Sequence, residues 1–382
     1  MKISNRKIVI INQAANYLTI GICNGFAKKF EYVDLITGSV HVQGEELNPK
    51  INIRYISKWK EEHGLGKILI YLRALITFYF LLITKYRKHE VFFISVPPMG
   101  YLLNIILPNR FSMIIWDVYP DVLKITGMKE THLAYRIWSK LNRLSFKKAY
   151  RLFTIGERIA DLIGHYVKRD KIIIQPIWSI FQHNSKVSKE NNPFVKEHNL
   201  KDKFVVQYSG NIGVAHNVEI MVYLAEKMIN YPHILFQIIG RGPRKKKLRK
   251  FVEDKKLINC QFLPFQSDDM FPFSLSAADL GIVILDDLAS KGSVPSKSYN
   301  LMSFGIPSLY ISATDSELND YANRYNHAKC FKKNNFDAMI AYILNLSNDK
   351  KLYATYEENA LKAANYFKID NAKKIVDKYL ID

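Results

Sequence analysis

Short runs rich in β-branched and aromatic residues recur along this chain, and each is followed by a stretch with helical periodicity. In the first half of the 382 residues they occupy positions 7–12, 32–37, 52–57, 91–96, 111–118 and 151–156. When strands alternate with helices, each helix returns the chain to the starting edge of the sheet, so neighbouring strands run parallel. The sequence therefore predicts an α/β protein with parallel sheets.

The alternation stops once and then restarts. Residues 181–203 combine charge, asparagine and proline, which is typical of a linker or a domain edge. A chain of this length exceeds what one hydrophobic core usually serves, so we predict two domains. Strand-like runs return at 204–210, 234–240, 260–264, 280–286 and 307–312. The expected parts are residues 1–185, a linker at 186–203, a second domain at 204–365, and a C-terminal helix at 366–382 that packs back on the first domain.

The formal net charge of +20 calls for an anionic partner or surface. Nucleic acid, an anionic membrane and phosphate-bearing small molecules are the candidates. Cys23, Cys260 and Cys330 have no metal-binding or redox spacing, which suits a reducing compartment. The first twelve residues lack the pattern of a signal peptide, so we expect a cytoplasmic protein.

Residues 68–83 form the most apolar segment, and Lys85, Arg87 and Lys88 follow it. A membrane-spanning helix needs about 20 apolar residues, whereas this run is shorter and is interrupted by Arg73. Two interpretations remain. The segment is either a helix buried against a sheet or a helix partly inserted into an anionic bilayer, with the basic run at 135–151 beside it.

Three loops follow strands of the second half and should meet at one sheet edge, where ligands bind in such folds. Their sequences are "YSGNIG" (208–213), "GRGPRKK" (240–246) and "SKGSVPSK" (290–297). Glycine-freed backbone amides beside cations make an anion site suited to a diphosphate. The candidate donor-binding residues in these loops are Ser209, Gly210, Asn211, Gly213, Arg241, Pro295, Ser296 and Lys297.

Lys297 lies in the first turn of a predicted helix, where the helix dipole disfavours a cation unless an anion is bound. A diphosphate would resolve that conflict. Tyr299 and Asn300, with Ser298, lie within the next turn and could offer polar contacts to a ribose or a sugar.

The order of "YSGNIG", "GRGPRKKKL", "LPF", "ADLGIVIL" and "VPSKSYNLMSFGIP" resembles the donor-binding half of the GT-B glycosyltransferases, most nearly the family 4-like enzymes of bacterial surface polysaccharide synthesis. The segment "WDVYPDVLKITGM" (116–128) resembles an element of their first domain. The resemblance implies two Rossmann-like domains facing a cleft, a nucleotide-sugar donor on the second, an acceptor on the first, and no essential metal.

The chain departs from the family pattern at two pairs of positions. Gly292 and Asn300 stand where many members carry glutamates, and Asn211 and His216 stand where an arginine and a lysine are usual. Arg241 and Lys297 are expected to supply the missing positive charge.

The resulting hypothesis is a metal-independent glycosyltransferase that uses a nucleotide sugar, with uridine as the expected nucleoside, and needs no other cofactor. Its acceptor would be a saccharide or a polyprenyl-linked saccharide. The protein would lie in the cytoplasm or on the inner face of the membrane, and nucleic acid is not an expected partner. Asp117 is the leading candidate for the base and Asp121 the alternative, while Asp117 could instead brace its turn. A GT-B nucleotide-sugar epimerase and a non-catalytic basic binding protein remain as alternatives.

Overall fold

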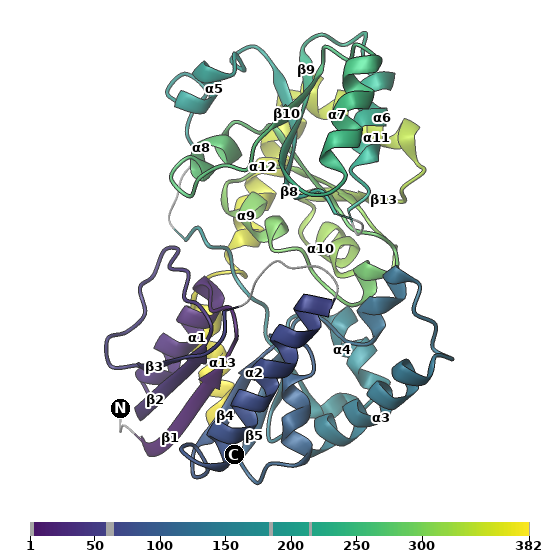
Figure 1. The fold of residues 1–382 in the computed structure, drawn as a ribbon. Helices are drawn as coiled ribbons and strands as arrows, with labels where there is room; N and C mark the ends of the chain where they lie inside the picture. Colours follow the sequence, from purple (N-terminus) through teal and green to yellow (C-terminus); the bar gives the residue numbers. More distant parts are fainter. Residues whose placement is uncertain (1–3, 59–64, 183–185, 214–215, 382) are drawn as a thin grey trace. The chain divides into compact units, whose positions relative to one another are not determined.

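The computed structural model describes residues 4–58, 65–182, 186–213 and 216–381. The chain divides into two compact units, and Figure 1 shows the course of the chain through both. Unit 1 comprises Met1–Ile180 with Ile369–Asp382, and unit 2 comprises Phe181–Lys368. Each unit contains its own parallel sheet. Among the described residues, no helix is both long enough and apolar enough to cross a membrane.

Unit 1 is built on a seven-stranded sheet in the order β3-β2-β1-β4-β5-β6-β7, in which every neighbouring pair is parallel. The strands are β1 (Ser4–Ile11), β2 (Phe30–Thr37), β3 (Asn52–Tyr55), β4 (Glu90–Ile94), β5 (Phe111–Ile115), β6 (Leu152–Thr154) and β7 (Ile172–Ile174). Its helices are α1 (Tyr17–Ala27), α2 (Leu65–Ile83), η1 (Gly100–Ile105), η2 (Asp121–Thr126), α3 (Leu133–Lys148), α4 (Glu157–Gly164), η3 (Arg169–Lys171) and α13 (Asp370–Leu380).

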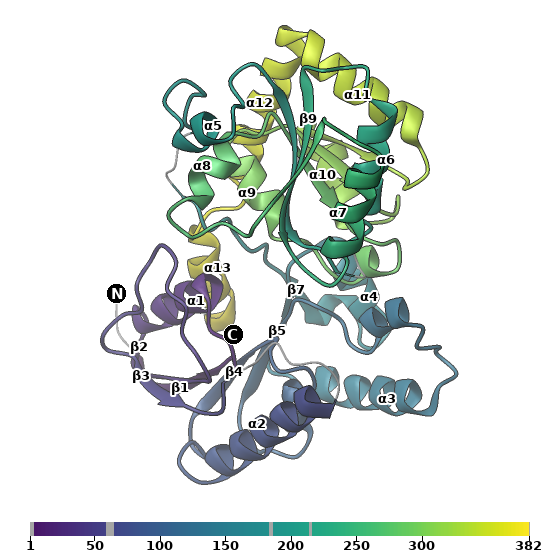
Figure 2. The same cartoon turned by 45° about the horizontal axis from the view of Figure 1, so that its top comes forward.

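Helices cover both faces of this sheet. From β1 the strand order extends both ways, toward β3 and toward β7, and right-handed crossovers in the two directions place their helices on opposite faces. On one face, α13 lies beside α1, as both views show (Figures 1 and 2). Tyr379 of α13 packs its ring against Phe26 of α1 and Phe92 of β4. The last helix of the chain is therefore part of the core of unit 1.

Unit 2 has a six-stranded parallel sheet in the order β10-β9-β8-β11-β12-β13. The strands are β8 (Phe204–Asn211), β9 (Ile234–Arg241), β10 (Cys260–Leu263), β11 (Leu280–Ile284), β12 (Ser308–Ile311) and β13 (Ala328–Phe331). The helices are α5 (Pro193–Glu197), α6 (Glu219–Lys227), α7 (Lys245–Asp254), α8 (Phe271–Ser276), η4 (Ala289–Lys291), α9 (Lys297–Ser303), α10 (Glu317–Tyr325), α11 (Phe336–Asn348) and α12 (Lys350–Ala364).

The segment at 186–203, which we expected to be a linker, packs into unit 2 instead. Asn192 caps the short helix α5, and Phe194 of that helix is fully buried. Lys189 donates to Asp279 and to the carbonyl of Lys203, at 2.6 Å in both cases. The polar composition of this stretch therefore reflects capping and ion pairing within the unit, so its interpretation as a linker is wrong.

Candidate active site

The sheet of unit 2 reverses its winding between β8 and β11, which are hydrogen-bonded neighbours although β9 and β10 lie between them in sequence. In open α/β sheets, ligands bind at such a switch point, outside the carboxyl ends of the strands. The loops after β8, β9 and β11 all begin at this edge. They are the three loops predicted to meet at one sheet edge.

The loops after β8 and β9 approach so closely that glycine is required. Gly210, Gly240 and Gly242 have φ angles of 149°, 156° and 151°, a region that other residues rarely adopt. A Cβ at position 240 would overlap the carbonyl oxygen of Gly210, and one at position 242 would overlap that of Ile212. Tyr208 donates its hydroxyl to the carbonyl of Asn211 at 2.6 Å and so braces the first loop from below. The two loops form one packed unit.

Lys297 begins α9, and its ammonium group is buried beside these loops. Nζ lies 4.0 Å from the centroid of the Tyr208 ring and would lie 2.9 Å from a Cβ at position 210. Within the part of the chain that the structure describes, no atom accepts a hydrogen bond from it. Burial lowers the pKa of Lys297 to about 7. A buried ammonium with three unused donors is costly, which makes this point receptive to an anion.

A small cavity of about 20 Å³ adjoins Lys297. That is room for about one water molecule. Two of its polar lining residues, Ser209 and Asn300, are predicted donor-binding residues, and Asn300 is 9% exposed. The cavity is lined by Gln207, Ser209, Phe271, Leu275, Ile282, Lys297, Asn300 and Leu301.

His216, which departs from the family pattern, lies close to this site. Its Nδ1 lies 3.0 Å from the carbonyl oxygen of Ile284, at the end of β11. Since a carbonyl oxygen can only accept, Nδ1 carries the proton and Nε2 is left as an acceptor. Burial, followed by the nearby charge of Lys297, lowers the pKa of His216 to about 4. The ring is therefore neutral at physiological pH.

The cations of the loop after β9 differ in their roles. Lys245 donates to the carbonyls of Gly240 and Leu263 at 2.8 and 2.7 Å, and Arg244 pairs with Glu219 at 3.0 Å. These two side chains hold the loop. Arg241, in contrast, is exposed at the end of β9, with its guanidinium 5.5 Å from the ring centroid of Phe265.

The remaining predicted donor-binding residues differ in exposure. Pro295 is half-buried and Ser296 is exposed, both directly before α9, and Asn211 is exposed at the end of β8. Gly213 follows in the same loop, and its φ is not positive. Tyr299 is fully buried, with its hydroxyl 3.3 Å from that of Tyr321, so the structure places it in the core and not on the surface of the loops.

The two candidate bases in unit 1 have different surroundings. Asp121 is buried, accepts hydrogen bonds from the hydroxyls of Tyr135, at 2.7 Å, and Tyr166, and pairs with Lys124 at 3.0 Å. Both of its carboxylate oxygens are therefore already engaged within unit 1. Asp117 follows β5 and is half-buried; burial raises its pKa to about 6. No described residue donates a hydrogen bond to it.

Nearby amides engage Asp286, the first residue of the acidic pair after β11. Asp286 accepts from the backbone amide of Leu288 at 3.0 Å and lies 3.5 Å from the side-chain amide of Asn217. No group of three or more potential metal ligands occurs among the described residues.

Comparison with known proteins finds similarity to glycosyltransferases. Residues 188–363 match the family described as Glycosyl transferases group 1. The chain is 28% identical over 208 residues to the putative colanic acid biosynthesis glycosyl transferase WcaI of Escherichia coli, covering 52% of this chain and 50% of that protein. It is 25% identical over 222 residues to the probable glycosyltransferase WbjE of Pseudomonas aeruginosa, covering 57% and 54%. The chain thus matches about half the length of these relatives.

Solved structures match over nearly the whole chain. Anabaena HepE, in complex with UDP and glucose, has a TM-score of 0.72 at 12% identity and covers 98% of this chain and 99% of its own. WaaG, a glycosyltransferase involved in lipopolysaccharide biosynthesis, has a TM-score of 0.70 at 14% identity and covers 98% and 100%.

Two Rossmann-like units with this strand order and these structural relatives define a GT-B protein, which confirms the predicted fold class. The predicted resemblance to GT-B glycosyltransferases is confirmed as well. The match to the Glycosyl transferases group 1 family, residues 188–363, covers most of unit 2.

Proposed function

We propose that this protein transfers a sugar from a uridine diphosphate sugar to a saccharide or lipid-linked saccharide acceptor in surface polysaccharide synthesis. The observation that carries the proposal is the buried Lys297 ammonium, which has no acceptor among the described residues and adjoins the glycine loop at 210–213. The names of the relatives support the reaction class, and the UDP bound to HepE supports the nucleotide.

The proposed reaction breaks the bond between the anomeric carbon and the diphosphate oxygen and forms a bond from that carbon to an acceptor hydroxyl oxygen. The electron pair of the broken bond leaves on the diphosphate, where Lys297 and Arg241 would stabilise the charge. Asp117 would take the hydroxyl proton. With a pKa of about 6, its carboxylate is mostly deprotonated at pH 7 and is a stronger base than an ordinary aspartate. No metal or further cofactor enters the proposal.

Ligand-induced thermal stabilisation tests the donor site without knowledge of the acceptor, because a ligand that binds the folded state raises the melting temperature. We expect UDP and a UDP-sugar to stabilise the wild type and to have much less effect on Lys297→Met. Product analysis then separates the reaction classes: UDP plus an extended acceptor supports transfer, whereas a free, altered UDP-sugar would indicate an epimerase. The donor site would be misassigned if no nucleotide changed the melting temperature.

We further propose that unit 1 binds the cytoplasmic face of an anionic membrane, where a lipid-linked acceptor would be found. Helix α2 buries Ala74, Phe78 and Leu82 within unit 1. Its other side exposes a stripe of apolar side chains at helical spacing, each between 49% and 65% exposed: Ile68, Leu69, Leu72, Ile76 and Phe80. The two interpretations of this segment are thus compatible, since one helix has both a buried face and an apolar exposed face.

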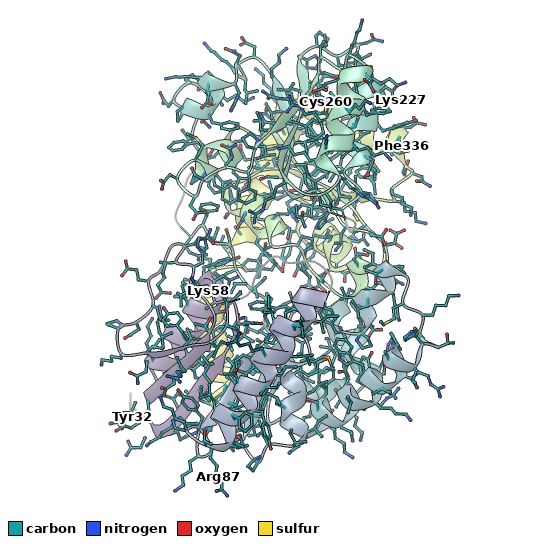
Figure 3. The ribbon with its side chains drawn as sticks, viewed as in Figure 1. Tyr32, Lys58, Arg87, Lys227, Cys260 and Phe336 are labelled. Atoms are coloured by element: carbon teal, nitrogen blue, oxygen red, sulfur yellow. The ribbon has the colours of Figure 1, made fainter. Side chains whose placement is uncertain are left out.

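Exposed cations flank this stripe. Lys85, Arg87 and Lys88 follow α2, and Figure 3 shows Arg87 pointing away from the ribbon. The exposed side of α3 carries apolar side chains, including Ile137, together with basic ones: Arg136, Lys140, Arg143 and Lys147. Each such cation near an anionic leaflet contributes about 1 kcal/mol. Lys148 is not counted among these cations, because its Nζ donates to the carbonyls of Ile105 and Leu107 at 3.1 and 2.9 Å.

Co-sedimentation with phosphatidylglycerol vesicles tests this surface. We expect binding that weakens with salt and is lost in Ile76→Ser/Phe80→Ser. Replacing Lys140 and Lys147 with glutamine should weaken binding about tenfold or more, while all variants keep UDP-induced stabilisation. Equal sedimentation of the wild type and the α2 variant would refute the membrane surface and leave the donor site untouched.

A further inference from the structure

A second cluster of cations lies in unit 1, at the edge of the sheet opposite to the one that carries Asp117. Arg110 directly precedes β5, Arg151 directly precedes β6, and Lys171 directly precedes β7. These strands are parallel neighbours, so their amino ends share one edge. A cavity of about 360 Å³ opens there and is lined by Tyr150, Arg151, Asp170, Lys171 and Ile173.

The ring of Tyr150 gathers two guanidinium groups. The Cζ atoms of Arg110 and Arg151 lie 3.8 and 4.8 Å from its centroid. Arg110 is partly neutralised, because it lies 3.8 Å from Glu90, but Arg6 already binds that carboxylate at 2.6 and 2.7 Å. The π face of Tyr150 attracts both guanidinium groups, but it leaves their positive charge in place.

Arg151 and Lys171 form the charged wall of the cavity. The Nε–H of Arg151 is shielded from water and has no acceptor among the described residues. Burial, followed by the charge of Arg151, lowers the pKa of Lys171. Asp170 lines the same cavity, yet within the described chain it forms no ion pair with either cation. Two cations therefore line one cavity, and the Nε–H of one of them is a buried donor without an acceptor among the described residues.

We propose that this cavity binds a phosphate monoester. A phosphate dianion would accept from the Arg151 guanidinium and from the Lys171 ammonium and would relieve their mutual repulsion. Tyr150 and Ile173 supply an apolar wall for the carbon atoms next to the phosphate. The ligand is either a soluble phosphorylated metabolite or the headgroup of a phosphatidic acid-type lipid. This site uses no residue of the donor site, so it goes beyond the proposed function.

Titration calorimetry with glycerol 3-phosphate tests the soluble source. The full-length chain is first saturated with UDP, so that the donor site contributes no heat. We expect Arg151→Gln and Lys171→Gln each to weaken binding at least tenfold, because each removes a charged hydrogen bond. Lys168→Gln is the matched control, since Lys168 is an exposed lysine three residues away that does not line the cavity. Addition of the ligand should also shift the Arg151 Nε–H resonance in the wild type.

Vesicles test the lipid source. At equal mole fraction, phosphatidic acid should retain the wild type more strongly than phosphatidylglycerol, and Lys171→Gln should remove that difference while Lys168→Gln keeps it. Binding in either arm that depends on Lys171 supports the proposal. Failure of both arms, or equal effects of Lys168→Gln and Lys171→Gln, would overturn it, and Lys171→Gln with an unchanged melting temperature excludes misfolding as the cause.

Discussion

The affinity for UDP should depend on pH through Lys297. Its pKa is about 7 in the free protein, because the ammonium is buried without an acceptor. A bound diphosphate would return this pKa toward its ordinary range, so binding above pH 7 must be accompanied by proton uptake. The affinity then follows the protonated fraction of Lys297. It should fall roughly tenfold per pH unit above pH 7.5, or roughly 75-fold between pH 6.5 and 9, which corresponds to about 2.5 kcal/mol.

Titration calorimetry of UDP across this range provides the measurement, repeated at pH 8 in two buffers with different ionisation enthalpies. We expect the uptake of nearly one proton per UDP at pH 8. His216 does not contribute, because its pKa of about 4 keeps it neutral throughout. Lys297→Arg keeps its charge and should show a flat profile, whatever its absolute affinity. If the wild type and Lys297→Arg had parallel profiles, the pH dependence would belong to another group.

Three further predictions concern the donor site of unit 2 and Asp117 of unit 1. Arg241→Ala should weaken UDP binding by about 1.5 to 3 kcal/mol, whereas the exposed Lys246→Ala, measured by the same calorimetry, should change it little. Asp117→Asn should lower turnover about 100-fold or more while sparing UDP affinity, and an unchanged rate would make this residue structural. In the wild type, kcat/KM should decrease below about pH 6, because Asp117 becomes protonated there. Lys297→Met should raise the melting temperature of the ligand-free protein at pH 7, because this lysine is protonated more readily in the unfolded chain than in the folded one. The gain in melting temperature should shrink as pH rises from 7 toward 10.5. A lower melting temperature of the variant at pH 7 would contradict the cost assigned to the buried ammonium.

The long strands could be predicted from sequence because their side chains are buried in continuous apolar runs, as in β5 and β11. We missed β7 and β13, which have three and four residues and lie at sheet edges. Three or four residues are too few to show a strand pattern, even where, as in β7, all three are isoleucine. Their pairing depends on a neighbouring strand that is distant in sequence.

Helix geometry decides which of the predicted residues of α9 lie together. Asn300 follows Lys297 by three positions, so both lie on one face of α9 and line one cavity. Tyr299 follows by two positions, which places it on the far side, in the core. The partners of Asp121, Tyr135 and Tyr166, lie 14 and 45 residues away in sequence, so local spacing could not reveal that its carboxylate is already engaged.

The return of α13 to unit 1 sets an order of events during synthesis. Tyr379 supplies part of the aromatic cluster around Phe26, Phe30 and Phe92. A ribosome that has released residues 1–180 has therefore delivered a sheet whose α1 face lacks its last helix. Unit 2, which is continuous in sequence, can complete its core first. The α1 face of unit 1 then stays uncovered until α13 has been made, which happens only after the whole of unit 2.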